Sequence, residues 1–167
     1  KKDAKKAIDH FSRSLVLAKE LSDVSLIATL YVYLGDTYVG MNDYDRAYNY
    51  YKLGIESAKE NDDKELTLQL LNSISRVLIQ KKNYTQAIIY LEQALDANSS
   101  KSLKIPLSNT YKELAQAYAG INNYEKAYQY HLLHTTVDST VFNTDREKTS
   151  LEITSKYNIE KKAKEIL

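Results

Sequence analysis

Apolar residues recur along this chain at the three- and four-residue spacings that mark one face of a helix. The clearest example spans residues 28–58, where two such blocks are separated by the four residues from Gly40 to Asp43. Because this connection is so short, the two helices are expected to lie antiparallel as one hairpin. The two apolar faces consist of Ile27, Tyr31, Leu34, Gly35 and Tyr38, and of Tyr44, Ala47, Tyr48, Tyr51, Ile55 and Ala58.

The hairpin pattern repeats with a period of forty residues, without an insertion or a deletion. A period kept through so many positions predicts an array of repeats, in which each hairpin buries its apolar face against its neighbours. The small side chains of Ala47, Ala87 and Ala127 are expected at close helix crossings. Other aligned positions are Leu34, Ile74 and Leu114; Gly35, Ser75 and Ala115; Tyr38, Leu78 and Tyr118; and Tyr44, Tyr84 and Tyr124.

At these positions the chain resembles the tetratricopeptide repeat family, over about residues 3–138. The resemblance implies an all-α fold: a right-handed α-solenoid of antiparallel helix hairpins, here followed by a charged C-terminal helix. The period of forty exceeds the thirty-four typical of the family, which adds roughly one and a half helical turns to each repeat. The best copy of the motif reads Leu34-Gly35-x-x-Tyr38, then Ala47-x-x-x-Tyr51-x-x-Gly54-Ile55.

The alignment divides the chain into a repeat domain at 1–138 and a C-terminal capping or connector helix at 139–167. The first helical pattern matches only the second half of a repeat, so its partner helix is expected to precede Lys1 and the chain to belong to a longer protein. Asp43, Asn83 and Asn123 each stand where a short polar side chain caps a second helix, and Asn83 with Gln86 resembles a capping box. The expected units are a half repeat at 3–21 and repeats at 24–60, 64–97 and 102–138.

Thr144 and Glu147 have the spacing of a capping box and predict the start of a helix that runs to Leu167. Its apolar stripe is sparse. A sparse stripe is typical of a helix that caps the last repeat. The alternative is the start of a connector or coiled coil, through which the chain could form a homo-oligomer. The stripe consists of Leu151, Ile153, Tyr157, Ile159 and Ile166.

The segment from Asp138 to Ile166 is similar to the piece that follows the repeats in bacterial sensor kinases and LuxR-type transcriptional regulators. This resemblance implies a protein or peptide interaction and sensing module of a bacterial signalling or transcriptional regulator. It also favours the periplasmic side of a membrane-tethered parent protein, with a cytoplasmic location as the alternative. A free-standing structural adaptor, used for complex assembly or self-association, is the alternative function.

Composition and charge narrow the range of partners. The net charge is +1, from 23 basic and 22 acidic residues, so nucleic-acid binding through this segment is not expected. The absence of cysteine excludes disulfides and thiolate chemistry. No apolar run of about 18 residues predicts a membrane span, and the first residues, KKDAKK, do not resemble a signal peptide.

The sequence carries no motif of a phosphate-binding loop, a hydrolase nucleophile or a metalloprotease. We therefore expect no enzymatic activity, no cofactor and no metal. His131 and His134 have the spacing of a metal-binding pair, but both occupy repeat positions filled elsewhere by packing residues, and no third ligand is fixed nearby. Tyr50, Tyr90 and Tyr130 lie beside the apolar stripe and could line a second contact surface.

The face of each first helix opposite its apolar stripe is the candidate binding site. In the family that the chain resembles, these faces line a concave groove for an extended peptide or a partner helix. Amides, cations and small apolar side chains suit a peptide, although a solvated helix face would look similar. The candidate residues are Thr29, Val32, Asp36, Gln69, Asn72, Arg76, Ile79, Asn109, Lys112 and Gln116.

Arg76 stands at the centre of this face and is expected to face Asp36 and Gln116. It is well placed to bond a carboxylate or a peptide carbonyl, the alternative being an exposed ion pair with Asp36. Val32 and Asp36 stand where chaperone-binding members of the family begin their basic clamp. Binding of a chaperone tail is therefore not expected.

Overall fold

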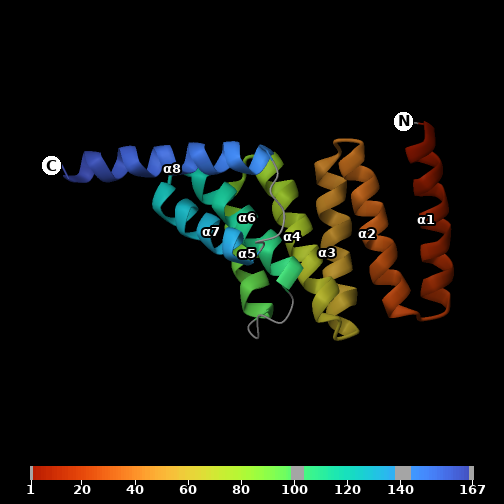
Figure 1. Cartoon of the computed structure of the whole chain (residues 1–167). Helices are drawn as coiled ribbons and strands as arrows, with labels where there is room; N and C mark the ends of the chain where they lie inside the picture. The colour runs from red at the N-terminus through yellow and green to blue at the C-terminus, as the bar shows by residue number, and fades with distance from the viewer. Residues whose placement is uncertain (1, 99–103, 138–143, 166–167) are drawn as a thin grey trace.

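The computed structural model describes residues 2–98, 104–137 and 144–165, with side chains at 3–98, 107–137 and 149–164. These residues form eight α-helices and no strand (Figure 1). The helices are α1 (Lys2–Glu20), α2 (Val24–Gly40), α3 (Tyr44–Glu60), α4 (Lys64–Gln80), α5 (Tyr84–Ala97), α6 (Lys104–Gly120), α7 (Tyr124–Val137) and α8 (Thr144–Glu165).

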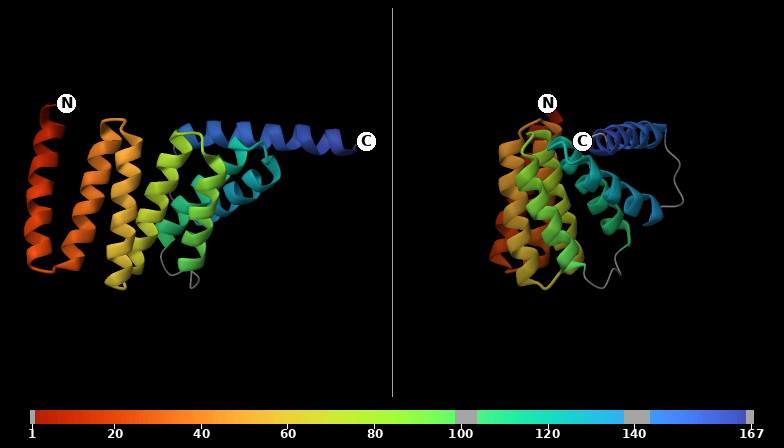
Figure 2. Two further views of the ribbon diagram at one scale, coloured as in Figure 1. Left: turned by 180° about the vertical axis from the view of Figure 1, so that it is seen from behind. Right: turned by 90° about the vertical axis from the view of Figure 1, so that its left-hand side faces the viewer.

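The helices stack in chain order as antiparallel pairs, with the two termini at opposite ends of the array (Figures 1 and 2). Helices α2 and α3, α4 and α5, and α6 and α7 form the three hairpins, with α1 before them and α8 after them. The all-α helical-repeat solenoid expected from the period is thereby confirmed. The helix bounds lie within the expected repeat ranges, except that α1 begins one residue before its range, at Lys2. The division into two domains stays a prediction.

Five of the connecting turns have the same geometry and follow one another at multiples of twenty residues. In each, a residue in the left-handed region follows the helix, and the next residue donates its N–H to a carbonyl five residues back, as Asp43 does to Tyr38 at 2.9 Å. These two features define a Schellman-type helix end. The left-handed residues are Ser22 (φ 53°), Asn42 (60°), Asp62 (50°), Lys82 (58°) and Asn122 (61°).

Most of the expected helix caps are present. The carboxylate of Asp43 accepts a bond from the Arg46 N–H at 3.2 Å, and the Asn123 amide oxygen accepts one from the Lys126 N–H at 3.2 Å. Asn83 is the exception, because its side chain makes no capping bond, so the predicted capping box there is wrong. The first-turn side chains Thr144 and Glu147 lie outside the described side chains.

The aligned small residues lie at the centre of the core. Ala47, Ala87 and Ala127 are completely buried. The hydroxyl of Ser75 donates to the Leu71 carbonyl at 2.8 Å and approaches the Ala87 carbonyl at 3.4 Å. Helices α4 and α5 therefore touch through small side chains and backbone, which is the close crossing that the pattern predicts.

Tyr50, Tyr90 and Tyr130, the candidate second surface, are half-buried and packed against other tyrosines. Tyr50 stacks on Tyr38, with ring centroids 5.4 Å apart and planes 6° from parallel. Tyr130 stacks on its neighbour Tyr118 in the same way, at 5.6 Å and 6°. The hydroxyl of Tyr90 lies 2.8 Å from that of Tyr48 and joins α5 to α3. Packing within and between hairpins accounts for these rings.

Helix α8 packs against α7 and projects beyond the last hairpin (Figures 1 and 2). Ile153 is buried, and the ring of Tyr157 stacks on that of Tyr128 at 4.8 Å. Leu151 and Ile159 instead remain 71% and 66% exposed. The predicted single stripe is therefore divided between two faces of the helix. Ile166 lies outside the described residues.

Candidate functional site

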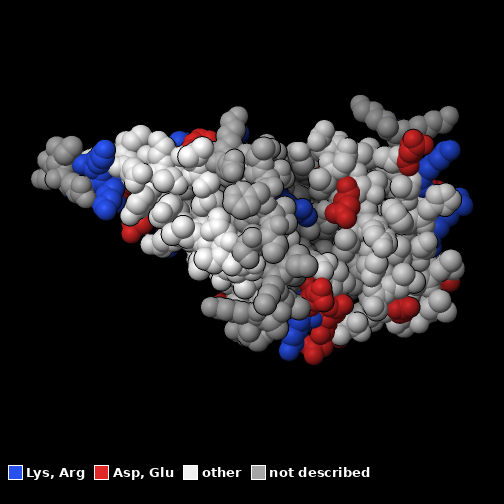
Figure 3. Space-filling model, in the orientation of Figure 1, with Lys and Arg blue, Asp and Glu red and all other residues white. Residues whose placement is uncertain are grey.

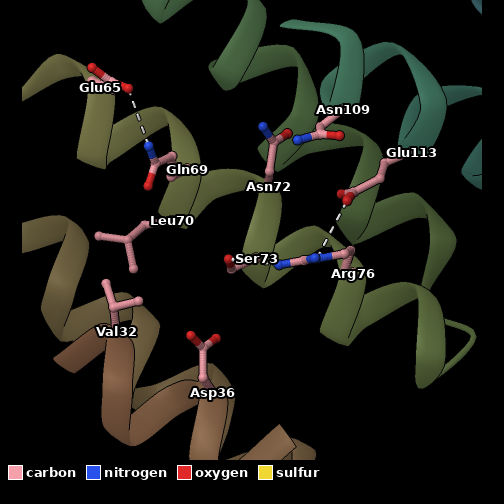
Figure 4. Close-up of a pocket in the computed structure, with 10 residues that line it drawn as sticks. All are labelled: Val32, Asp36, Glu65, Gln69, Leu70, Asn72, Ser73, Arg76, Asn109 and Glu113. Atoms are coloured by element: carbon pink, nitrogen blue, oxygen red, sulfur yellow. Dashed lines mark hydrogen bonds and ion pairs between the residues drawn. The ribbon is translucent and has the colours of Figure 1, made fainter. Parts of the chain in front are cut away.

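Helices α2, α4 and α6, the first helices of the three hairpins, share one side of the array and enclose a concavity of about 460 Å³. We call this surface the first-helix groove. Figure 4 shows its side chains converging from the three helices. They are Val32 and Asp36 from α2; Glu65, Gln69, Leu70, Asn72, Ser73 and Arg76 from α4; and Asn109 and Glu113 from α6.

The structure brings six of the ten predicted site residues together in this concavity: Val32, Asp36, Gln69, Asn72, Arg76 and Asn109. The other four lie elsewhere. The Thr29 hydroxyl donates to the carbonyl of Ser25 on its own helix at 3.0 Å, and Ile79 is buried. Lys112 and Gln116 are exposed on α6 without lining the concavity. A binding role for any of the ten residues stays a prediction.

Asn72 is buried and holds two walls of the groove together. Its amide oxygen accepts a hydrogen bond from the hydroxyl of Thr110 at 2.9 Å, which joins α4 to α6. A buried polar pair of this kind fixes the register between the two helices, because sliding one helix past the other would leave buried polar atoms without a hydrogen bond. The structure therefore gives Asn72 a role in building the groove, in addition to its place on the wall.

Arg76 does not have the partners expected from the sequence. Its guanidinium Nε lies 3.5 Å from Glu113 Oε1, and Nη2 donates to the hydroxyl of Ser73 at 3.2 Å. The alternative of an ion pair with Asp36 is also wrong, because the Asp36 carboxylate instead accepts a 2.5 Å hydrogen bond from the hydroxyl of Tyr51. The sequence could not predict these partners, because a long side chain on a helix can reach several neighbouring residues. The packing of the helices determines which of those residues it contacts.

Glu113 lines the concavity but is not among the ten site residues that the sequence predicts. Its side chain is only 7% exposed, and one carboxylate oxygen, Oε2, is buried without a hydrogen-bond partner. Burial raises the pKa of this carboxyl to about 8, although the positive charges of Arg76 and Lys112 act in the opposite direction. The helical spacing from Asn109 to Glu113 and on to Gln116, four and then three residues, could have placed it on the candidate face.

Tyr51 connects the core to the floor of the groove. Its ring is buried in α3 beside Gly35, and its hydroxyl reaches through to Asp36 on the wall. Burial and the neighbouring carboxylate of Asp36 both raise the pKa of this phenol, so it stays a hydrogen-bond donor. Asp36 is thereby held in one position by a core residue.

His131 and His134 are buried, and the ring nitrogen Nδ1 of His134 lies 2.9 Å from the Ser108 hydroxyl. Within the described part of the chain, no three His, Cys, Asp or Glu side chains gather in a way that could hold a metal ion.

Charged side chains of both signs are spread over the side of the molecule in Figure 3. None of the described helices combines the length and the apolar character needed to cross a bilayer.

Comparisons with known proteins agree with this architecture. Residues 27–100 match the tetratricopeptide repeat family. BtubC (BKLC) from P. vanneervenii has a similar solved structure, with a TM-score of 0.80 and 20% identity over 93% of this chain and 66% of that chain. A kinesin light chain-like protein of Podosopora anserina with nearly identical TPR-like repeats also has a similar solved structure. Its TM-score is 0.71 and its sequence identity is 13%, over 97% of this chain and 81% of that chain. No curated protein matches the sequence. At these identities the structural likeness establishes the fold alone.

Proposed function

We propose that this chain binds an extended segment of a partner protein in the first-helix groove, since residues 27–100 match the tetratricopeptide repeat family. Repeats of this family imply a protein interaction module and generally form non-catalytic scaffolds. The observation that carries the proposal is the concavity of about 460 Å³, to which three consecutive hairpins contribute side chains. A site built across repeats suits a ligand that runs along the array.

The chemistry of the walls supports a peptide ligand. Gln69 and Asn109 are exposed and offer amides that bond peptide backbone in either direction. Val32 and Leu70 form an apolar side of the same concavity (Figure 4). Groups of both kinds let a groove bind the backbone of a segment and select among its side chains.

A blocking substitution tests the groove directly. A library of random twelve-residue peptides displayed on phage is selected on the wild-type chain, and the binding of enriched peptides is measured by fluorescence anisotropy. Gln69→Trp, which fills the groove from an exposed position on α4, should weaken binding at least tenfold. The matched control is Lys52→Trp, at an exposed position on α3 outside the concavity, and it should leave binding unchanged. Equal effects of the two variants would place binding elsewhere.

As part of the same proposal, the module belongs to a bacterial signalling or transcriptional regulator, on the periplasmic side of a membrane-tethered protein. The support is the similarity of the segment from Asp138 to Ile166 to the connectors of such regulators. Fractionation of cells that express the complete gene from its own promoter tests the location. Protection from protease in intact spheroplasts would contradict a periplasmic site and favour the cytoplasm.

Self-association is the second candidate function, and the projecting part of α8 favours it. Leu151 and Ile159 are exposed there, eight residues apart on one face of the helix. If α8 pairs with a second copy, sedimentation equilibrium should show a dimer that Leu151→Ser with Ile159→Ser converts to a monomer. A wild-type chain that is monomeric at about 100 μM would contradict this adaptor function.

A further inference from the structure

The first-helix groove is lined by more acidic than basic side chains. Asp36, Glu65 and Glu113 line the concavity, and Arg76 is the cation that lines it. Arg76 is already engaged, by Glu113 Oε1 at 3.5 Å and by the Ser73 hydroxyl at 3.2 Å. The three acids come from three different helices, with Glu65 beside Gln69 at the start of α4 and Asp36 and Glu113 on the two sides of Arg76 (Figure 4).

One of these acids, Glu113, has a buried oxygen atom without a hydrogen bond. Glu113 Oε2 is buried, and it accepts no hydrogen bond from the protein, although its carboxylate lines the concavity. The cost of burying this carboxyl as an unpaired charge raises its pKa to about 8. A cationic donor at Oε2 offsets that cost and favours the ionised carboxylate. The amine of a lysine or the guanidinium of an arginine supplies such a donor together with the opposite charge.

We propose that the first-helix groove selects partner segments that present a lysine or arginine side chain, which enters between Asp36 and Glu113 and donates to Glu113 Oε2. This inference rests on the proposed function of the groove. Val32, which is one helical turn before Asp36 on α2 and lines the same concavity, would cover the aliphatic part of the incoming side chain (Figure 4). Asp36 is positioned for the cation by its hydrogen bond from Tyr51.

An acidic ligand fits this site poorly. A carboxylate would have to approach Arg76 while facing Asp36, and it would compete with Glu113 for the guanidinium. Like charges that share one concavity oppose binding, and they oppose it more strongly where burial lowers the effective dielectric. This charge preference is the opposite of the one expected from the sequence, in which Arg76 bonds a carboxylate or a peptide carbonyl of the partner.

The test uses acetylated and amidated hexapeptides in a positional scanning library, so that no free terminus contributes a charge. Binding to the wild-type chain is compared with binding to two variants. Glu113→Gln keeps the shape of the side chain and removes its charge. Arg76→Gln removes the competing cation, and it provides a second measurement should the substitution at the buried site disturb folding.

We expect the wild-type chain to prefer lysine or arginine at one library position by at least tenfold over norleucine. Glu113→Gln should reduce that preference to less than about threefold, and Arg76→Gln should strengthen binding of the basic peptides. Weaker binding of basic peptides to Arg76→Gln, or a wild-type preference for Asp or Glu, overturns the inference while leaving a peptide groove in place. If no peptide binds, or if Gln69→Trp does not weaken binding, the proposed function fails together with the inference.

Discussion

The ring of Tyr51 lies directly over the backbone of Gly35, so close that a β-carbon added at Gly35 would stand 2.3 Å from Tyr51 Cε1. Helices α2 and α3 of the first complete hairpin can approach only because position 35 has no side chain. The same contact carries the Tyr51 hydroxyl to Asp36, so it supports the groove wall as well as the core.

Gly35→Ala should therefore destabilise the chain, although alanine is the better helix former. Overpacking costs roughly 1 to 3 kcal/mol, and the gain in helix propensity returns at most about 1 kcal/mol. The control is Gly40→Ala, since a β-carbon there meets nothing within 4 Å. Urea denaturation should show a lower midpoint for the first variant and an equal or higher one for the second.

Ala87→Leu tests the crossing between α4 and α5. Ala87 is completely buried, and its carbonyl lies 3.4 Å from the Ser75 hydroxyl, so three extra carbon atoms have no space. We expect a loss of about 1 to 3 kcal/mol in the free energy of unfolding. Ala97→Leu, the same substitution at the exposed end of α5, should change it by less than about 0.5 kcal/mol. An unchanged midpoint for Ala87→Leu would mean that this crossing is loose.

The repeated turn geometry makes one surface substitution stabilising. Lys82 has a φ of 58°, a conformation that is strained for a residue with a β-carbon and relaxed for glycine. Lys82→Gly should raise the free energy of unfolding by up to about 1 kcal/mol. Gln80→Gly, two residues earlier at the last position of α4, should instead lower it, by less than about 1 kcal/mol. Thermal denaturation should show a higher midpoint than the wild type for Lys82→Gly and a lower one for Gln80→Gly.

The buried carboxyl of Glu113 should make stability depend on pH. Its pKa is 4.5 ordinarily and about 8 in the folded chain, so the folded state holds a proton that the unfolded state has lost between these values. Stability therefore falls as pH rises from about 4.5 to about 8, by a few kcal/mol at most. Arg76 and Lys112, the cations facing this carboxyl, limit the effect.

Glu113→Gln should remove this contribution. Relative to the wild-type chain it should gain stability between pH 5 and pH 8, as measured by urea denaturation at each pH. The same substitution at Glu65, which lines the groove but is exposed, serves as the control and should track the wild-type curve. Parallel curves for Glu113→Gln and the wild type would show that the carboxyl is solvated in solution.

The helices and their order follow from local sequence patterns. Helix faces are local patterns, and the forty-residue period repeats them at Leu34, Ile74 and Leu114, so the array could be predicted without tertiary information. A finer signal was also present: Asp23, Asp43, Asp63, Asn83 and Asn123 fall at multiples of twenty residues, each just after a left-handed turn residue. Because such turns are built by neighbouring residues, the sequence carries them too.

Which side chains meet in the groove depends on how the helices pack. The helix faces correctly brought six of the ten predicted residues into one concavity, but the pairing of Arg76 with Glu113 and of Asp36 with Tyr51 depends on how α2, α3, α4 and α6 stack. Long side chains reach neighbours on several helices, and small changes in the angle between helices exchange those partners. The burial of Glu113, and with it the polarity of the site, is therefore a property of the packed array and not of the local sequence.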